Sequence, residues 1–455
     1  MMAVWSQATF SGITIFDRCD GEYFLPTYLK NENELDHIDT IPLPTIFHVS
    51  DGNHLSVSKH FSNVGIPYFR GQDINDFFLE NALPIMIPEK VFSSPMMTRS
   101  HFYAGDVLLS IVGTIGSLSI VPESSGPATG SCKIAILRSK GNYSPFVLAA
   151  FLLSRFGQLQ IQRNTRGAVQ MGLILKDLVR VRVPIFEETA AYQIEQLVKH
   201  AIENNRKSKA SYNQAQHLLE SELGLDKLKF KKPVGYTARF SALEQSRRLD
   251  AQHFQPRFDQ IINHLSGIDT KRVRDIRFYN RRGVQPVYVD DGPISVVNSQ
   301  HIGPQHIDYD GLQKTSEKAF AASPEGHIKP NDLLIYTTGA YIGRTNVYLS
   351  DQPALASNHV NILRLNSGID AAYMALVFQA VIGQFQTQKH LRGSAQAELY
   401  PNDIDKFVVP LLAPRKQAAI GDSVRSSLEK QQESKRLLEQ AKARVEQLIE
   451  EAAAR

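Results

Sequence analysis

Short hydrophobic segments, alternating or continuous, recur along the chain in the manner of β-strands. Three of them are followed, after a gap of about 190 residues, by three similar ones: 106–112, 117–121 and 133–139, then 332–338, 345–350 and 359–365. Each set leads into a longer apolar stretch of helical character, at 145–162 and at 371–388, and then into a short strand-like segment ending in Pro184 or Pro410. The pattern predicts an α+β fold that is built twice.

The two sets are copies of one another. Residues 127–185 align with residues 353–411 without a gap, and 18 of the 59 paired positions are identical, where composition alone gives roughly four. The match continues in the lead-in segments that begin at Ala8 and Ala238, in the segments that begin at Ile66 and Ile294, and in the glycine-containing segments at 105–116 and 331–343. A repeat this long indicates two whole domains, each able to bury its own core.

The repeat and the composition of the segments between its copies predict a domain organisation. We expect domain 1 at residues 1–187, a helix at 188–224, domain 2 at 225–413 and a second helix at 414–455. The copies diverge most at Leu29–Gly65 and Asp259–Gly292. Shared segments cannot distinguish two different ligands, so any difference in recognition between the domains is expected in these divergent segments.

Each copy ends in a long segment without Gly or Pro, from about Glu188 to Leu223 and from about Arg415 to Ala454. Heptad spacing in the first includes Ile194, Ala201, Ser208 and Ala215 with Leu197 and Leu218, beside Val198, Tyr212 and Leu219. Heptad spacing in the second includes Val424, Gln431, Leu438 and Val445 with Ser427, Ser434, Ala441 and Leu448. Both seams are apolar at the ends and polar in the middle, so antiparallel pairing as a coiled coil would match middle with middle.

The residues expected to form the helix–helix or partner interface are Ile194, Leu197, Tyr212, Leu219, Val424, Leu438, Val445 and Leu448. Each helix would be about 55 Å long at about 1.5 Å per residue, a length that favours a spacer between the two domains. The alternative is that each amphipathic helix packs only on its own domain.

Composition excludes several classes of protein. The chain is 42% hydrophobic and 21% charged, with a net charge of +4, as in ordinary globular proteins. Cys19 and Cys132 show no disulfide or metal-site spacing, which fits a reducing cytoplasm. The N-terminus lacks a signal-peptide pattern, and the longest uncharged apolar run, which begins at Phe146, has eight residues and is too short to span a bilayer.

Sequence signatures of catalysis are absent. No phosphate-binding, dinucleotide-binding, zinc-protease or hydrolase motif occurs, nor does the Asn/Asp-Pro-Pro-aromatic run of amino-methyltransferases. The histidines, including His253, His301 and His306, lack metal-ligand spacing. The glycines at 105–116 follow a strand without a lysine or helix start, which favours a tight turn between strands over a phosphate loop. We therefore expect no catalytic residues, metal or cofactor in this chain.

Basic residues indicate a nucleic-acid partner. The run Lys271–Arg282 contains six positive charges and one Asp, and similar loops at 162–170 and 388–396 carry Arg-Gly-x-x-Gln at equivalent positions. Arg, Asn and Gln hydrogen-bond to base edges, and Lys and Arg neutralise phosphates; the alternative is ordinary solvated surface. The candidate DNA-binding residues are Arg163, Asn164, Arg166, Gln170, Arg277, Arg281, Arg282, Lys389, Arg392 and Gln396.

The whole chain resembles the specificity subunits of type I restriction–modification systems. The resemblance is carried by two variable domains that are each followed by a long helix, by the segment GDVLLSIVGTIG at 105–116, and by a closing V-x-V-P at Val181–Pro184. The second copy departs from this motif, with NDLLIYTTGAYIGR at 331–344. The starts of the two long helices also depart from the family pattern, which has Glu-Gln after the closing proline.

The resemblance implies a non-catalytic protein that reads double-stranded DNA in the cytoplasm. Each domain would read one part of an asymmetric, bipartite site, and the paired helices would fix the gap and dock two methyltransferase subunits, which a restriction/translocase subunit joins. S-adenosylmethionine would be the cofactor of the partner. Alternatives are a specificity partner of a fused methylase–nuclease, a protein-binding scaffold, and an enzyme with a divergent site.

Overall fold

The computed structural model describes residues 6–7, 18, 20–167, 171–230, 233–393 and 397–455. The chain forms two compact units: unit 1 is Met1–Arg206 with Gln431–Arg455, and unit 2 is Lys207–Lys430. Each long helix therefore contributes residues to both units. The domain limits expected from the sequence stay a prediction.

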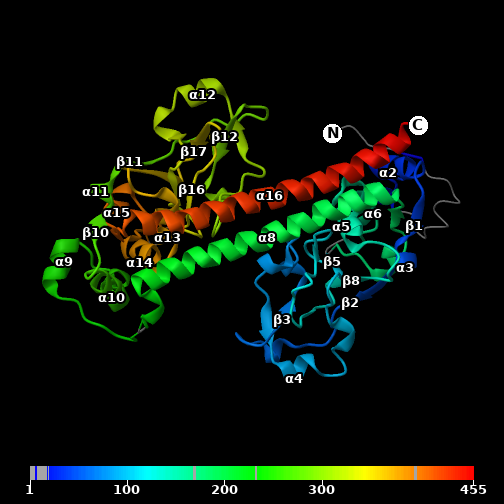
Figure 1. Cartoon of the computed structure of the whole chain (residues 1–455), viewed down its shortest axis with the longest axis horizontal. Helices are drawn as coiled ribbons and strands as arrows, with labels where there is room; N and C mark the ends of the chain where they lie inside the picture. Colours follow the sequence, from blue (N-terminus) through cyan, green and yellow to red (C-terminus); the bar gives the residue numbers. More distant parts are fainter. Residues whose placement is uncertain (1–5, 8–17, 19, 168–170, 231–232, 394–396) are drawn as a thin grey trace. The chain divides into compact units, whose positions relative to one another are not determined.

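A four-stranded antiparallel sheet forms the centre of unit 1 (Figure 1). Its strand order is β2 (Phe47–Asp51), β8 (Ile134–Ser139), β5 (Val107–Ser110) and β6 (Leu118–Ile120). A smaller sheet contains β4 (Ile85–Ile87), β3 (Ile66–Phe69) and β7 (Thr129–Gly130), and β1 (Thr40–Pro42) pairs with β9 (Arg182–Pro184). β5 is buried on both faces, as its continuous apolar sequence predicts.

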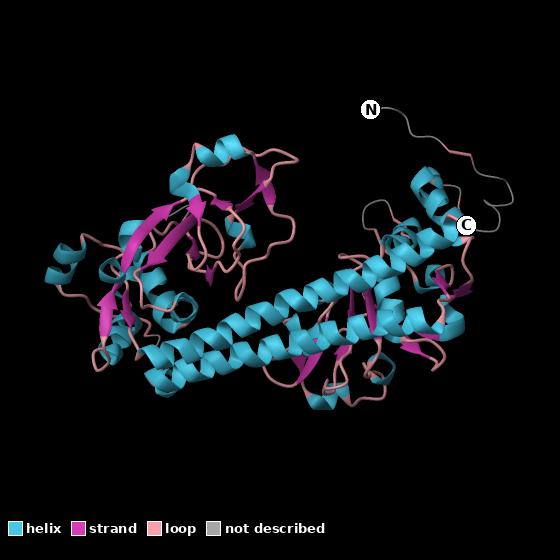
Figure 2. Cartoon of the chain, turned by 45° about the horizontal axis from the view of Figure 1, so that its top comes forward, coloured by secondary structure: helices cyan, strands magenta, loops and turns pink. Residues whose placement is uncertain are grey.

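Unit 2 repeats this architecture (Figure 2). Its large sheet has the order β11 (Arg277–Arg282), β18 (Val360–Leu365), β15 (Leu333–Tyr336) and β16 (Thr345–Val347). Its smaller sheet has the order β13 (Gln313–Thr315), β12 (Ile294–Val297), β17 (Ala354–Ala356) and β14 (His327–Ile328), and β10 (Thr270–Arg272) pairs with β19 (Val408–Pro410). Val107 pairs with Leu137 in unit 1, and Leu333 pairs with Leu363 in unit 2. Each residue of the second pair lies 226 residues after the equivalent residue of the first pair. The repeat in the sequence is therefore also a repeat in the fold.

Short helices connect these strands. In unit 1 they are α2 (Pro26–Leu35), α3 (Leu43–Ile46), α4 (Glu89–Phe92), α5 (Pro145–Leu153), α6 (Arg155–Arg163) and α7 (Leu175–Leu178). In unit 2 they are α9 (Phe240–Ser246), α10 (Pro256–Leu265), α11 (Val273–Ile276), α12 (Glu317–Ala321), α13 (Ala371–Gln379), α14 (Val381–His390) and α15 (Pro401–Ile404). The 3-10 helices are η1 (Gly21–Phe24), η2 (Ser58–His60), η3 (Gly71–Asp73), η4 (Leu79–Asn81), η5 (Thr98–Ser100), η6 (Leu225–Lys227), η7 (Ala251–Phe254), η8 (Ser299–His301) and η9 (Pro324–Gly326).

The glycine-containing segment of each copy is a tight turn between two strands, as predicted. In unit 1 the turn joins β5 to β6, and Gly113 and Gly116 have φ angles of 91° and 89°. Side chains other than glycine rarely adopt this conformation. Gly339 and Gly343 take the same roles between β15 and β16.

The helical stretch of each copy is two helices rather than one. In unit 1 the break is at Ser154, whose ψ angle is 161° and whose hydroxyl accepts a hydrogen bond from the amide of Gly157. A Cβ atom at Gly157 would lie 2.3 Å from the carbonyl oxygen of Phe151, so only glycine allows the two helices to meet this closely. Gly383 takes the same place in unit 2.

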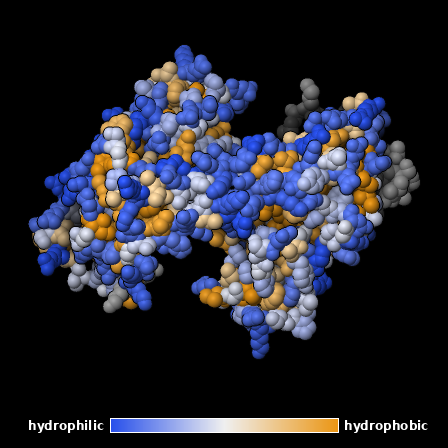
Figure 3. Space-filling model, in the orientation of Figure 1, coloured by the Kyte–Doolittle hydropathy of each residue, from blue (hydrophilic) through white to orange (hydrophobic). Residues whose placement is uncertain are grey.

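Two long helices, α8 (Glu188–Leu223) and α16 (Pro414–Ala453), follow the two copies. In unit 1 the buried positions Ile194 and Val198 of α8 join one core with Ala441 and Val445 of α16. In unit 2 the equivalent faces bring Tyr212, Leu219 and Val424 into one core. In the view of Figure 3 the outer faces of both helices are mostly hydrophilic.

The helices pair antiparallel within each unit through a polar layer. In unit 2 the hydroxyl of Ser208 donates to the carbonyl of Ser427 at 2.8 Å, and Glu222, later in α8, pairs with Lys416, earlier in α16. In unit 1 the hydroxyl of Ser434 donates to the carbonyl of Ala201 at 2.6 Å. The predicted antiparallel pairing and the predicted match of polar middles are confirmed.

The buried seam differs from the predicted one in one row. Leu218 is 36% exposed, whereas Leu219 is 1% exposed. The buried neighbour of Ala215 along the seam is therefore Leu219, four residues later, rather than Leu218, three residues later. The prediction for Leu218 is wrong because the row follows the full α-helical repeat, in which positions i and i+4 share a face. The predicted interface residues Leu197, Leu438 and Leu448 are partly buried against the core of unit 1.

A buried carboxylate–arginine pair joins neighbouring strands in each unit. In unit 1 Arg138 of β8 donates two hydrogen bonds to Asp106, at 2.8 and 2.7 Å. In unit 2 Arg364 makes the same two bonds to Asp332, at 2.6 and 2.7 Å. These aspartates precede β5 and β15, so the acidic residue of the glycine motif stabilises the sheet.

No helix among the described residues is long and apolar enough to cross a membrane. Cys132 is a free thiol, and Cys19 lies outside the described residues.

Candidate nucleic-acid interface

Each domain carries a loop that is closed by two backbone hydrogen bonds. In unit 1 the amides of Arg166 and Gly172 each donate to the carbonyl of the other residue, both at 2.8 Å. In unit 2 Arg392 and Glu398 exchange the same bonds, at 2.9 and 2.7 Å. These are the Arg-Gly loops expected from the sequence. Two predicted contact residues, Gln170 and Gln396, lie outside the described residues.

A buried carboxylate holds the arginine of each loop. The guanidinium of Arg166 donates to both oxygens of Asp177, at 2.7 and 2.8 Å, and that of Arg392 donates to both oxygens of Asp403 at the same distances. The two aspartates are 0% and 1% exposed, whereas the arginine side chains are 35% and 49% exposed. The buried aspartate therefore orients each guanidinium, while the arginine side chain remains partly exposed to solvent.

A second cation contacts each of these carboxylates. Arg180 lies 3.6 Å from Asp177, and Lys406 lies 2.7 Å from Asp403. Burial opposes ionisation of Asp403, but the hydrogen bonds from Arg392 and Lys406 outweigh it and hold the pKa of this carboxyl below its usual range. Arg392 is thus held by a carboxylate that stays charged.

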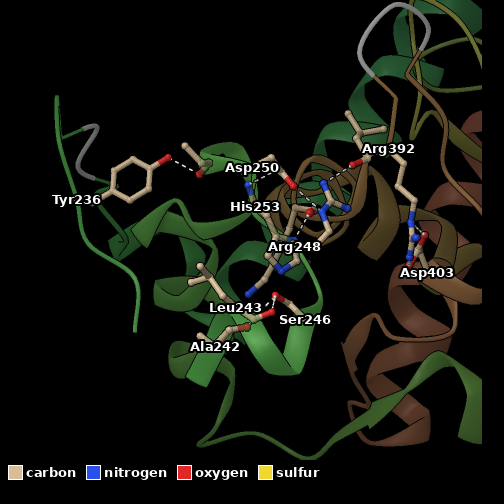
Figure 4. Close-up of polar contacts among 12 residues, drawn as sticks. Tyr236, Ala242, Leu243, Ser246, Arg248, Asp250, His253, Arg392 and Asp403 are labelled. Atoms are coloured by element: carbon tan, nitrogen blue, oxygen red, sulfur yellow. Dashed lines mark hydrogen bonds and ion pairs between the residues drawn. The ribbon is translucent and has the colours of Figure 1, made fainter. Parts of the chain in front are cut away.

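The lead-in segment supports the loop of unit 2 from the other side. Arg248 donates to the carboxylate of Asp250 at 2.6 Å and to the carbonyl of Leu391 at 2.8 Å. Figure 4 shows this arginine on one side of the loop strand and the pair Arg392–Asp403 on the other. The hydrogen bond from Arg248 lowers the pKa of Asp250.

Unit 1 has the equivalent support. Arg18 donates two hydrogen bonds to Asp20, both at 2.6 Å, and one to the carbonyl of Thr165 at 3.3 Å. Arg18 and Asp20 of the first lead-in segment therefore have the same role as Arg248 and Asp250 of the second.

The predicted residues just before the loops do not face outward. Arg163 and Asn164 are 9% and 3% exposed, and Arg163 pairs with Glu32 at 2.8 Å. Lys389 takes the place of Arg163 in unit 2 and pairs with Asp259 at 2.9 Å. As the structure places them, these side chains anchor the base of each loop.

The basic run of unit 2 lies on β10, α11 and the edge strand β11. Arg277 is held by both oxygens of Asp405, at 2.9 and 2.6 Å. Arg282, at the end of β11, lies 3.5 Å from Glu398 of the loop. Arg281 is exposed. The strand end and the Arg-Gly loop are therefore neighbours in unit 2.

The corresponding edge strand of unit 1 ends in the opposite charge. Asp51 ends β2 as Arg282 ends β11, and their partner residues on the next strand are 226 apart in the sequence. Gly52 and Gly283 follow them, and a Cβ atom at either would lie within 2.3 Å of a backbone carbonyl oxygen. Only glycine fits there, so the two strand ends are structurally equivalent. Asp51 is paired with Arg99.

Two exposed arginine–aromatic pairs beside the loop of unit 2 were not predicted. The guanidinium of Arg344 lies 3.7 Å from the ring centre of Tyr341, and that of Arg282 lies 4.7 Å from the ring centre of Tyr400. Such rings and cations stack on bases and neutralise phosphates. The one-residue insertion of the second copy, which falls at Tyr341, is the sequence signal for the first pair.

Histidines of unit 2 pack beneath the loop. The rings of His253 and His390 are 5.8 Å apart. Burial lowers the pKa of His390 to about 4, so the ring is neutral at physiological pH. Among the described residues no group of three or more His, Cys, Asp or Glu side chains is arranged to hold a metal ion.

Comparison with known proteins finds structural neighbours only. No family model matches the chain, and no curated protein matches it in sequence. A crystal structure of the S subunit of a type I restriction–modification system from M. genitalium is similar at 12% identity over 91% of this chain and 96% of that chain, with a TM-score of 0.47. The HsdS subunit from Thermoanaerobacter tengcongensis is similar at 14% identity over 90% and 96%, with a TM-score of 0.29. The type IIG restriction endonuclease BpuSI matches 38% of this chain at 12% identity and a TM-score of 0.32. Likenesses this weak do not assign a function.

Proposed function

We propose that this chain is the non-catalytic DNA-recognition subunit of a type I restriction–modification complex. Each of its two domains would read one part of an asymmetric, bipartite duplex site. The observation that carries the proposal is the duplication itself: one framework occurs twice, with the same clamped loop and with different side chains at equivalent strand ends, such as Asp51 and Arg282.

Unequal modules on one chain favour an asymmetric site. Identical modules would read a palindrome, as symmetric dimers do. Because both modules belong to one chain, binding of the second half-site is intramolecular, so modest affinities for each half multiply. The antiparallel helices α8 and α16 would set the gap between the half-sites.

The proposed partners follow from the resemblance in the sequence. Two methyltransferase subunits would dock on this chain, and a restriction/translocase subunit would join them. S-adenosylmethionine would bind the methyltransferase. A specificity partner of a fused methylase–nuclease is the second candidate, because it would share the two-domain design; the neighbouring genes distinguish the two.

The division of roles between subunits has a direct test. The purified chain, incubated with duplex DNA of mixed sequence and labelled S-adenosylmethionine, is expected to transfer no methyl groups above the blank. Addition of the methyltransferase encoded beside it should produce methylation at one bipartite sequence. Methyl transfer by the chain alone would contradict a purely recognition role, and a scaffold that binds only protein would fail to shift DNA in a gel at graded salt.

The clamped loop arginines are expected to contact DNA. Arg166→Ala and Arg392→Ala should each weaken binding by about 1–3 kcal/mol if the guanidinium contacts a base edge. If it contacts only phosphate, the dependence of log Kd on log salt should become shallower by about one unit. Titration of labelled duplex at several salt concentrations measures both quantities.

A matched variant separates contact from loop support. Asp403→Asn removes the carboxylate that holds Arg392 but keeps the guanidinium itself, so it should retain most of the affinity that Arg392→Ala loses. Melting curves of both variants control for folding. If folded Arg166→Ala and Arg392→Ala both keep the affinity and salt slope of the wild type, the loops do not contact DNA.

A further inference from the structure

The segment from the first short strand of each domain (β1 or β10) to the end of the edge strand (β2 or β11) has a very different charge in the two domains. In unit 1 residues 40–51, which form β1, α3 and β2, contain no Lys or Arg and end in Asp51. In unit 2 the equivalent residues 270–282 form β10, α11 and β11. They carry six cations, namely Lys271, Arg272, Arg274, Arg277, Arg281 and Arg282.

This contrast is local and does not reflect net charge. Residues 20–187 contain 14 Lys and Arg against 15 Asp and Glu, and residues 250–413 contain 15 against 16. Within these equivalent ranges both copies therefore have the same formal charge of −1, and the excess of cations in domain 2 lies in residues 225–249 before them. The second domain concentrates its cations along one edge, where the first has none.

Most of these cations remain available to an external anion. Lys271 and Arg274 are 53% and 57% exposed, and their contacts with neighbouring aspartates, at 4.0 and 3.4 Å, are surface ion pairs, which contribute little stability. Arg272 and Arg281 are exposed and form no ion pair within the part of the chain that the structure describes. The other two are engaged within the chain: Arg277 is held by both oxygens of Asp405, and Arg282 lies 3.5 Å from Glu398 and donates to the carbonyl of Leu399.

One aromatic neighbour of this edge fits the same ligand. Tyr400 is 40% exposed and lies under Arg282, the last residue of β11. The ring orients the guanidinium of Arg282, which also lies 3.5 Å from Glu398. Phosphates of a duplex are the ligand that several exposed cations on one edge best match.

We propose that the second domain is the electrostatic anchor of the complex with DNA: the edge formed by β10, α11 and β11 supplies a larger share of the phosphate contacts than its equivalent in the first domain. The first domain would then depend more on contacts with bases than on charge. This division of roles rests on the proposed function and specifies how the two half-sites are held.

The test is the salt dependence of binding to duplex DNA of arbitrary sequence, measured with the full chain. Arg272→Gln with Arg281→Gln should make the slope of log Kd against log salt shallower by about 1.8, because each phosphate contact contributes about 0.9. The charge-matched control, Lys59→Gln with Lys90→Gln, removes two exposed lysines of unit 1 and should change the slope much less.

A gain-of-charge variant tests the equivalence of the two edges. Ser50 of β2 occupies the register position of Arg281, because their partners Ile136 and Ile362 are 226 apart in the sequence. Ser50→Arg should steepen the slope by about 0.9. An unchanged slope in Arg272→Gln/Arg281→Gln, or an equal loss in the lysine control, would overturn the proposal. Failure of the wild-type chain to bind any duplex would instead contradict the proposed function itself.

Discussion

Arg364→Ala is expected to lower the free energy of unfolding of unit 2 by about 3–5 kcal/mol. The variant leaves the carboxylate of Asp332, which is 0% exposed, without the guanidinium that donates to both of its oxygens. An uncompensated buried charge costs far more than the ion pair itself contributes. Chemical denaturation of the full chain, followed by a probe in unit 2, measures the loss.

The loss should depend on pH. Burial raises the pKa of Asp332 even though Arg364 opposes the shift, and removal of Arg364 should raise it further. A carboxyl whose pKa is higher in the folded than in the unfolded state stabilises the fold at low pH, and this stabilisation is lost as the pH rises through the folded value. The deficit of Arg364→Ala should therefore be smallest in acid and largest near neutrality.

A surface ion pair provides the control. Arg436 pairs with Glu433 on the exposed face of α16, so Arg436→Ala should have little effect on stability at any pH. If Arg364→Ala were as mild as Arg436→Ala at neutral pH, the buried pair would not be a main support of the sheet. Arg138→Ala tests the same point in unit 1.

Lengthening both long helices by one heptad is expected to widen the gap between the two half-sites by up to about three base pairs. Seven residues add about 10 Å of helix, and duplex DNA rises about 3.4 Å per base pair. The insertions belong after Lys207 in α8 and after Ser427 in α16, because Ser208 hydrogen-bonds to Ser427 across the antiparallel pair. A full heptad in each helix keeps the buried rows facing each other.

Selection of bound DNA with the intact partner complex reads out the gap. Each half-site should keep its bases, because neither domain is altered. A single insertion after Lys207 is the control: without a counterpart in α16 it should bulge and give a smaller or irregular change. An unchanged gap with full activity in the double insertion would mean that the helices do not set the spacing.

Much of this fold follows from the sequence because the chain contains two copies of one domain, which can be compared with each other. The positions shared by both copies indicate two domains, and the predicted β5–β6 glycine turn and the predicted match of the polar middles of the helices agree with the structure. Leu219 is buried as predicted, whereas Leu218, which is equally apolar and belongs to the same predicted seam, is exposed. Local sequence does not say which of two adjacent leucines faces a partner.

The candidate site was less accessible to sequence reasoning. Arg163 and Asn164 belong to a loop-like sequence, but Arg163 ends α6 and Asn164 follows it, and both residues are buried. The equivalence of Asp51 and Arg282 was hidden, because the copies diverge there and an irregularity between Arg277 and Tyr279 shifts the register of β11. Only strand pairing aligns these positions.

The central claim, that this chain directs methylation to a site with two separate and different parts, is tested most directly by mapping methylated adenines across the genome of the source cell with and without this gene. Deletion should abolish methylation at one asymmetric motif made of two short sequences that flank a gap of fixed length. Restoring the gene should restore that motif. Methylation that is unchanged by the deletion, or lost from a continuous palindrome, would contradict the account.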